Sequence, residues 1–526
     1  MTKKSKLMEE YFFLPNPNLR SWFGRTRKGV PQIVTTPLGK SEEPSALLDE
    51  WTKHLTCLKG TWPGLWKFEM DMAAKVGPMS YQLPLSERML DIDSYYDSIL
   101  YGSKPVSQRA LDVTLGEWGK KSISVRSPQE TILQMKLSTS SGSPYFTKRR
   151  NVYRQALRTQ VTRDSQIIDG NEYKLTAILG WRGQEGGPDV KDVKQRVIWM
   201  FPFAVNLQEL RVYQPLIEYA QREELVPAWI SMDKVDREIT ALLYTKAEDD
   251  LVICTDFTKF DQHFNCRCSE AAEYLLRGLL IDSDDSEYWM KEIFPIKYRI
   301  PMCYDWGMFK RGFHGMASGS GGTNADETLV HRALQHEAAI SAGAILNPHS
   351  QCLGDDGIIS FHGITVDKVL KSYTQHGLNM NESKQSASTT ECVYLRRWHH
   401  KDYRINEVCV GVYSTCRALG RLMYQERYYD PDLWGKEMVA LRQLSILENV
   451  KYHPLRNEFA QFIMKRDKYR LGLDIPGFLD NIDVIASEAR ANMDDFLGYT
   501  KSQQYAGDST AGIASWWIVR YLKSMA

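Results

Sequence analysis

Two adjacent aspartates, Asp355 and Asp356, follow Gly354 in a short polar break between apolar residues that end at Leu353 and resume at Ile358. Apolar runs on both sides of such a break predict a strand, a tight turn and a second strand. Neighbouring carboxylates at a turn repel each other, and a divalent cation such as Mg²⁺, which proteins use to handle phosphates, removes that cost. A Gly-Asp-Asp sequence also arises by chance in roughly one chain in ten of this length. Alone it is more typical of a solvated turn, so its meaning depends on partners elsewhere in the chain.

Composition limits the classes that need to be considered. The 526 residues are enough for about three structural units. The net charge of +1 gives no global basic surface, so any nucleic-acid surface must be local, as in a lined channel. The nine cysteines are scattered, which disfavours a disulfide framework or a structural zinc site and fits a reducing compartment. Segment 1–6 lacks an apolar core and segment 338–346 is too short to span a bilayer, so we expect neither a signal peptide nor a membrane segment.

The first partner of the acidic turn is Asp256. It follows the apolar run 251–254, which predicts a buried strand. The carboxyl end of such a strand is where an open sheet places ligand-binding groups. Together with Asp355 and Asp356, this side chain could hold two divalent ions roughly 4 Å apart, the spacing used for in-line phosphoryl displacement.

Two further segments carry groups suited to phosphates. The Gly-rich stretch 317–324 precedes a predicted amphipathic helix over 325–342, whose free N–H groups can face an anion; a flexible linker before a capped helix is the alternative. Lys194 and Arg196 are two residues apart at the start of a strand-like run and therefore share one face. Two such cations suit a triphosphate, although this spacing is also typical of a solvated strand edge. Residues 181–191 before them predict a mobile loop.

In this order and spacing, the segments resemble the motifs of viral RNA-dependent RNA polymerases, most of all those of picobirnaviruses. The resemblance covers residues 138–397. Motif A corresponds to Asp256 and Asp261, and motif B to Ser318, Gly319 and Thr323. Motif C corresponds to 354–356, and motif F to Lys194 and Arg196. Three further correspondences are less specific: motif G with 139–145, motif D with 376–381 and Lys384, and motif E with 394–397.

The resemblance implies an α+β right-hand fold of fingers, palm and thumb, with a palm built on an antiparallel sheet backed by helices. The implied domains are an N-terminal arm and fingers (1–213), palm (214–284), a fingers insertion (285–316), palm again (317–400), and the thumb with a C-terminal segment (401–526). It also implies RNA-templated transfer of ribonucleoside monophosphates to an RNA 3′-hydroxyl, with release of pyrophosphate.

The resemblance assigns roles to individual residues. Asp256 and Asp355 would hold two Mg²⁺ ions, which Mn²⁺ could replace. Asp356 is the less firm ligand because adjacent carboxylates in a tight turn cannot easily point the same way. Lys384 would be the general acid for pyrophosphate, with an exposed surface lysine as the alternative. The residues expected to hold the nucleotide are Lys194, Arg196, Asp261, Ser318, Thr323 and Asn324.

Sugar selection is expected to depend on Asp261. Its carboxylate can accept a hydrogen bond from a ribose 2′-hydroxyl, directly or through motif B, whereas a reverse transcriptase would carry a bulky apolar residue there. Many polymerases of this class carry Asn four residues after the motif B threonine. This chain has Glu327 at that position, so we expect Asn324 to take over the sugar contact.

The remaining expectations concern partners. Ser141, Gly142 and Pro144 would contact the template, and Arg396 and Arg397 the product. The resemblance further implies a monomer inside the capsid of a double-stranded RNA virus, in the virion interior and host cytoplasm. Two other classes stay open: a non-catalytic RNA-packaging protein on this fold, and a metal-dependent phosphohydrolase, although the chain lacks a GxxxxGK[ST] loop.

Overall fold

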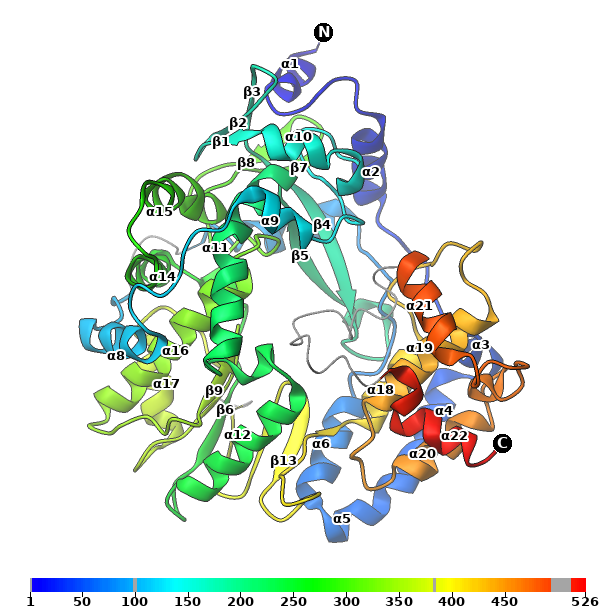
Figure 1. Cartoon of the computed structure of the whole chain (residues 1–526). Helices are drawn as coiled ribbons and strands as arrows, with labels where there is room; N and C mark the ends of the chain where they lie inside the picture. Colours follow the sequence, from blue (N-terminus) through cyan, green and yellow to red (C-terminus); the bar gives the residue numbers. More distant parts are fainter. Residues whose placement is uncertain (1, 98–101, 382–384, 493–511) are drawn as a thin grey trace.

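The computed structural model describes residues 2–97, 102–381, 385–492 and 512–526, and its elements are arranged in a cupped ring (Figure 1). At the centre of the fold is an antiparallel sheet of order β11-β6-β10-β9. Its strands are β6 (Val252–Thr255), β9 (Gln351–Leu353), β10 (Asp356–Ile359) and β11 (Ser386–Ser388). The strand predicted over 251–254 and the strand–turn–strand predicted around Gly354 are both confirmed.

Every residue of β6 is buried, because helices cover both faces of this sheet. Ile253 and Ile359 pack with α14 (Cys266–Leu279), α16 (Thr323–Ser341) and α17 (Val366–Thr374). Val252 and Ile358 point the other way and pack against α12 (Met232–Thr245). Alternate residues of each strand thus serve opposite faces, and the expected antiparallel sheet backed by helices is confirmed.

A second sheet forms the upper part of Figure 1, with the order β5-β4-β7-β8. Its strands are β4 (Ala177–Gln184), β5 (Lys194–Met200), β7 (Met302–Asp305) and β8 (Met308–Lys310). The mobile loop predicted over 181–191 is therefore wrong in its first part, because β4 continues to Gln184 and pairs with β5. The N-terminal helices α1 (Lys3–Glu9) and α2 (Pro17–Lys28) lie against this sheet through Met8 and Phe23.

The third body joins the two ends of the chain. Helices α3 (Pro37–Ser41), α4 (Pro44–His54), α5 (Leu58–Thr61) and α6 (Pro63–Ala73) share one core with α18 (Thr415–Met423), α19 (Lys436–Glu448), α20 (Arg456–Met464) and α22 (Trp517–Lys523). Glu69 is buried there and accepts hydrogen bonds from Thr415 and His453. The proposed limits between fingers, palm and thumb stay predictions.

The remaining α-helices and strands complete the ring. They are α7 (Met89–Asp93), α8 (Gln108–Trp118), α9 (Pro128–Leu133), α10 (Tyr153–Arg158), β1 (Gln160–Val161), β2 (Ser165–Ile168), β3 (Asn171–Lys174), α11 (Phe203–Arg222), α13 (Phe260–His263), α15 (Asp284–Tyr288), β12 (Glu391–Tyr394), β13 (Arg397–His400), β14 (Val412–Tyr413) and α21 (Ile482–Asn492). Among the described residues, no helix has the length and apolar character to cross a membrane.

Candidate active site

The register of the central sheet brings the predicted carboxylates together. Gly357 of β10 pairs with Thr255 of β6, so the next antiparallel pair along the ladder is Asp356 opposite Asp256. Asp355 occupies the two-residue turn between β9 and β10. Strand pairing alone therefore brings Asp256 to the same end of the sheet as Asp355 and Asp356, which lie about a hundred residues later in the sequence.

Residues of helix α16 form hydrogen bonds with this turn. The backbone N–H of Gly354 donates to Thr328 Oγ1 at 2.9 Å, and the backbone carbonyl of Gly354 accepts from His331 Nδ1 at 2.8 Å. A side chain at Gly357 would come within 2.7 Å of the His331 ring, so glycine permits the close approach. Thr328 and His331 could not be identified from the sequence, because both lie within an apolar helical pattern.

The carboxylates raise one another's pKa. Burial, followed by the charge of Asp355, raises the pKa of Asp356 to about 7. Burial also raises the pKa of Asp355, while the guanidinium of Arg196 opposes that rise. Such crowding of negative charge is relieved when a cation binds. Oxygen donors of this kind suit Mg²⁺ or Mn²⁺, but no three His, Cys, Asp or Glu side chains of the described segments converge as they stand to hold an ion.

The backbone of Asp256 is fixed by Gln385. The N–H of Asp256 donates to Gln385 Oε1 at 3.2 Å, and its carbonyl accepts from Gln385 Nε2 at 2.9 Å. The Asp256 side chain remains exposed. Sequence reasoning missed Gln385, and the proposed general acid Lys384 lies outside the described residues.

Asp261 and Ser318 are in direct contact, which joins predicted motifs A and B. Ser318 Oγ donates to Asp261 Oδ2 at 2.7 Å, and the hydroxyl of Tyr95 donates to the same oxygen at 2.7 Å. The N–H of Gln262 donates to the other oxygen at 2.9 Å. Tyr95 lies 166 residues before Asp261, so no local pattern could have identified it. The carboxylate is thus held in place before any ligand binds.

The Gly-rich stretch is an ordered loop rather than a flexible linker. Its Ser318 carbonyl accepts from the N–H of Trp199 in β5 at 2.9 Å. The buried carboxylate of Glu209 accepts from the N–H of Gly321 at 3.0 Å and from the Ser320 hydroxyl. Thr323 Oγ1 closes the turn by donating to the carbonyl of Ser320 at 3.2 Å. These contacts link the segment before α16 to β5 and to α11.

Asn324 and Glu327 differ in their hydrogen bonding. Asn324 Oδ1 accepts from Trp229 Nε1 at 2.9 Å, so part of its amide is engaged within the protein. Glu327 is buried, and its Oε1 has no hydrogen-bond partner in the described part of the chain. Burial, followed by the charges of Asp261 and Asp355, raises the pKa of Glu327 well above its usual range. Burial and the neighbouring negative charges therefore favour the protonated form of Glu327 over the ionised one.

The predicted cations fall into two groups. Lys194 and Arg196 are exposed on one face of β5, as the spacing predicted, and Arg196 is close enough to lower the pKa of Asp355. Arg396 likewise lowers the pKa of Asp356. Arg397 requires a correction: it is buried, and its guanidinium donates to Asp236 at 2.9 and 3.0 Å, so it is occupied inside the protein rather than presented to RNA.

The stretch expected to contact the template is also packed. Ser141, Gly142 and Pro144 are buried, and the Ser141 carbonyl accepts from the N–H of Phe203 at 2.8 Å. Gly142 has a φ of +58° and leaves no space for a side chain against the backbone of Phe201. These three side chains shape the loop, and their expected contact with RNA stays a prediction.

Comparison with known proteins agrees with this geometry. Residues 104–427 match the family model described as viral RNA-dependent RNA polymerase. A protein of Human picobirnavirus (strain Human/Thailand/Hy005102/-), named as a potential RNA-dependent RNA polymerase, is 56% identical over 524 residues, which cover 98% of each chain.

Solved structures show the same relationship. The crystal structure of the RNA-dependent RNA polymerase of a human picobirnavirus matches with a TM-score of 0.94 and 55% identity over 99% of each chain. An insertion-loop deletion mutant of such a polymerase matches with a TM-score of 0.92 and 52% identity, also over 99% of each chain. These likenesses confirm the right-hand polymerase fold, and the chain belongs to the viral RNA-dependent RNA polymerases.

Proposed function

We propose that this RNA-directed RNA polymerase performs nucleotidyl transfer at Asp256, Asp355 and Asp356 with two bound Mg²⁺ ions, for which Mn²⁺ can substitute. The observation that carries the assignment is the pairing of β6 with β10, which places Asp356 opposite Asp256 beside the turn at Asp355. The ions would supply a lowered pKa for the RNA 3′-hydroxyl and charge neutralisation for the leaving pyrophosphate. Asp256 is exposed, and Asp355 keeps accessible surface although its surroundings remove enough water to raise its pKa, so both side chains are accessible to an ion.

The protein's own groups bind and orient the nucleotide. Arg196 of β5 acts through its charge on Asp355, and Lys194 is exposed on the same face of that strand; together they would hold the triphosphate. The Asp261 oxygen that receives Ser318 would accept the 2′-hydroxyl of the ribose, directly or through Ser318. Thr323 and Asn324 would support that contact from the start of α16. We propose Lys384 as the proton donor to pyrophosphate.

RNA would be gripped by exposed cations around the site. Arg396 lies near Asp356 and suits the product strand, while Lys148 and Arg150 are exposed beside the packed loop that contains Ser141 and suit the template. Contacts to phosphates are independent of sequence, as a copying enzyme requires. We further propose that the protein acts as a monomer inside the capsid of a double-stranded RNA virus, in the virion and host cytoplasm, in both replication and transcription.

The decisive experiment is template-directed extension of a primed RNA with labelled ribonucleotides and added Mg²⁺ or Mn²⁺. Asp256→Ala and Asp355→Ala should each lower incorporation at least about a hundredfold. Asp233→Ala is the matched control, because Asp233 is an exposed aspartate of α12 paired only with Arg237 in the described structure. Full activity in Asp256→Ala or Asp355→Ala would show that the proposed metal ligands are wrong.

The same assay separates the alternatives. Incorporation that depends on both template and metal supports a polymerase. Binding of RNA without incorporation under either metal would instead favour a non-catalytic packaging protein. Rapid nucleotide hydrolysis in the absence of template would favour a phosphohydrolase.

A further inference from the structure

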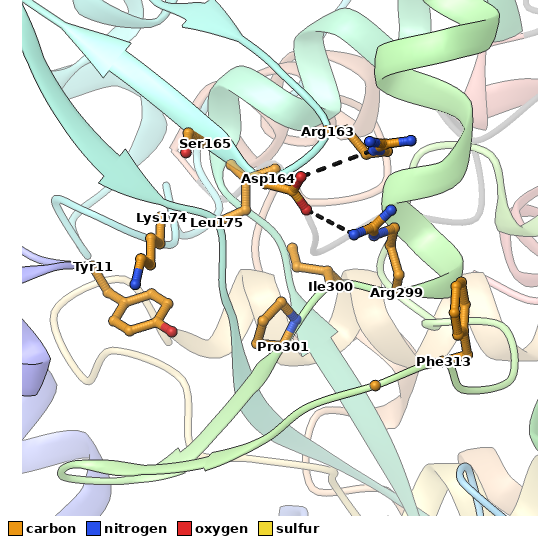
Figure 2. Close-up of a pocket in the computed structure, with 11 residues that line it drawn as sticks. Tyr11, Arg163, Asp164, Ser165, Lys174, Leu175, Arg299, Ile300, Pro301 and Phe313 are labelled. Carbon is orange, nitrogen blue, oxygen red and sulfur yellow. Dashed lines mark hydrogen bonds and ion pairs between the residues drawn. The ribbon is translucent and has the colours of Figure 1, made fainter.

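A cavity of about 310 Å³ is lined by residues of the β1–β2 turn, of β2 and β3, and of the segment before β7, apart from the aspartates of the central sheet. These strands lie in the upper part of Figure 1. The turn between β1 and β2 contributes Arg163 and Asp164, and the segment before β7 contributes Arg299 and Pro301. Phe313, from the loop that leads into predicted motif B, lies beside Arg299 at one end (Figure 2). Three separate parts of the chain therefore build one recess.

The recess contains two guanidiniums that share one carboxylate. Asp164 is shared by two guanidiniums: its Oδ1 is 2.9 Å from Arg299 Nη2, and its Oδ2 is 3.9 Å from Arg163 Nε (Figure 2). One carboxylate balances only one of these two charges, and each guanidinium has further N–H donors. Lys174 on the opposite wall is paired with Glu10. N–H donors without a carboxylate partner in this set therefore remain on the guanidiniums beside Asp164.

Three more groups complete the electrostatic surroundings. The hydroxyl of Tyr11, which lines the recess, accepts from Arg311 Nη2 at 2.9 Å. The carboxylate of Glu292 accepts from the N–H of Arg163 at 3.0 Å. The carboxylate of Glu172 accepts from the hydroxyl of the lining residue Ser165 at 2.6 Å. The four cations Arg163, Arg299, Lys174 and Arg311 are therefore matched by four carboxylates, those of Asp164, Glu10, Glu292 and Glu172. What the recess offers a phosphate is the N–H donors of Arg163 and Arg299 that the described residues leave free, rather than an excess of charge.

Phe313 gives this recess a second kind of recognition. Its side chain is 57% exposed although it is fully apolar. The guanidinium carbon of Arg299 lies 5.9 Å from the centre of its ring, so an aromatic face and a phosphate-binding group are adjacent. An exposed aromatic ring beside arginine is the pairing that proteins use to stack a base and hold its phosphate. An acidic peptide would use the cations but would have no need for the ring.

We propose that this recess binds one nucleotide of single-stranded RNA, with its base on Phe313 and its phosphate on Arg299 and Arg163. The enzyme works on RNA, which gives such a site a natural ligand. The inference does not depend on the metal or sugar assignments made for the active site.

The recess is also connected to the active site through the backbone. From Phe313 the chain runs directly toward motif B: the N–H of His314 donates to the carbonyl of Tyr298 at 3.1 Å, and that of Met316 to the carbonyl of Asp261 at 2.8 Å. RNA bound at Phe313 would therefore lie five residues before Ser318, which donates to the Asp261 carboxylate at 2.7 Å.

Site-specific photo-crosslinking tests the proposal, because it separates this recess from RNA bound elsewhere on the protein. The full-length enzyme carrying Phe313→p-azidophenylalanine is mixed with a labelled RNA of about ten nucleotides, without substrates for synthesis, and irradiated. The matched control is Tyr244→p-azidophenylalanine, since Tyr244 is an exposed aromatic residue of α12 at 84% exposure. We expect a strong RNA crosslink at position 313 and only background at position 244.

Charge variants then test the phosphate contact. Adding Arg299→Gln to the crosslinking protein should lower the yield at least about fivefold at moderate salt, whereas adding Arg277→Gln should not. Arg277 is a matched control because it is also a partly exposed arginine paired with carboxylates. Retained extension of a primed template shows that each variant is folded. Equal yields at positions 313 and 244, or no effect of Arg299→Gln, would overturn the proposal.

Labelled ATP distinguishes the source of the nucleotide. A crosslink to RNA that excess ATP does not reduce supports a strand-binding site. A crosslink to ATP itself, reduced by Arg299→Gln, supports the same chemistry with a free nucleotide as the ligand. Absence of both crosslinks would refute the site.

Discussion

Lys297 and Asp326 form an ion pair of 3.1 Å in which neither side chain has any exposed surface. Tyr213 and Tyr298 each donate a hydroxyl to Asp326 at 2.7 Å, and Lys297 Nζ also donates to the carbonyl of Phe294 at 2.9 Å. Asp326 belongs to the first turn of α16. This pair therefore anchors the helix that follows the Gly-rich loop and contacts the Gly-Asp-Asp turn.

Lys297→Met should destabilise the protein by about 3–5 kcal/mol, because it leaves the buried carboxylate of Asp326 without its counter-charge. Lys310→Met is the matched control. Lys310 pairs with Asp93 at 2.6 Å, but the two side chains are 35% and 40% exposed, so its loss should cost less than about 1 kcal/mol. Urea unfolding of both variants measures the difference. Equal losses would contradict the structural role given to the buried pair.

Tyr95→Phe should lower kcat/KM for ribonucleotides by about five- to tenfold, because it removes one of two hydroxyl donors to Asp261 Oδ2. Discrimination against deoxynucleotides should weaken with it. The neighbouring Tyr96 is a close control, since its hydroxyl is buried without a hydrogen-bond partner among the described residues. Single-nucleotide incorporation with paired ribose and deoxyribose substrates measures both effects. A similar loss in Tyr96→Phe would show that the effect is not specific to Asp261.

The sequence allowed correct prediction of features that depend on local pattern. The apolar run before Asp256 and the polar break at Gly354 define strands and a turn through neighbouring residues alone. The spacing of Lys194 and Arg196 likewise predicted that both side chains lie on one exposed face of β5. Once the strands pair, the carboxylates meet as a consequence of register.

Features that depend on distant contacts could not be predicted. Tyr95 and Gln385 reach the site from segments 166 and 129 residues away from their partners, with no local signature. Arginine is usually an exposed residue, but Arg397 is buried because its guanidinium pairs with Asp236, which lies 161 residues earlier. The end of β4 at Gln184 was missed because pairing with β5 overrides glycine-rich local sequence.

Thr328→Val should lower the rate of incorporation, because it leaves the N–H of Gly354 without its acceptor and loosens the turn that carries Asp355. An unpaired buried N–H costs about 1–3 kcal/mol, so stability should fall as well. Thr240→Val separates the two effects, since Thr240 Oγ1 accepts the N–H of Cys409 at 2.9 Å away from the turn. Specific activity, corrected for folded fraction, should fall only in Thr328→Val. An equal fall in both variants would indicate a general loss of stability.

Glu117 should make the stability of the protein depend on pH. It joins α8 to α16 by accepting from Arg332 Nε at 2.8 Å and contacting His336 Nε2 at 2.7 Å. Burial alone would raise the pKa of Glu117, but Arg332 and His336 outweigh it and lower the pKa to about 2. A depressed pKa means that the folded state favours the ionised carboxylate more than the unfolded chain does. Glu117 is exposed over part of its surface, so solvent screens these charges and the contribution to stability at neutral pH is on the order of 1 kcal/mol.

That contribution is complete above the unfolded pKa of roughly 4.3 and is lost as the pH falls toward the folded pKa. The difference in unfolding free energy between the wild type and Glu117→Gln should therefore be largest at pH 7 and shrink to about half near pH 3. Urea unfolding at a series of pH values measures it. Glu270→Gln is a control, because Glu270 is exposed and paired only with Arg267 in the described structure; its effect should stay small throughout. A Glu117→Gln difference that does not change with pH would contradict the ion-pair origin of this stability, since the loss would then come from packing alone.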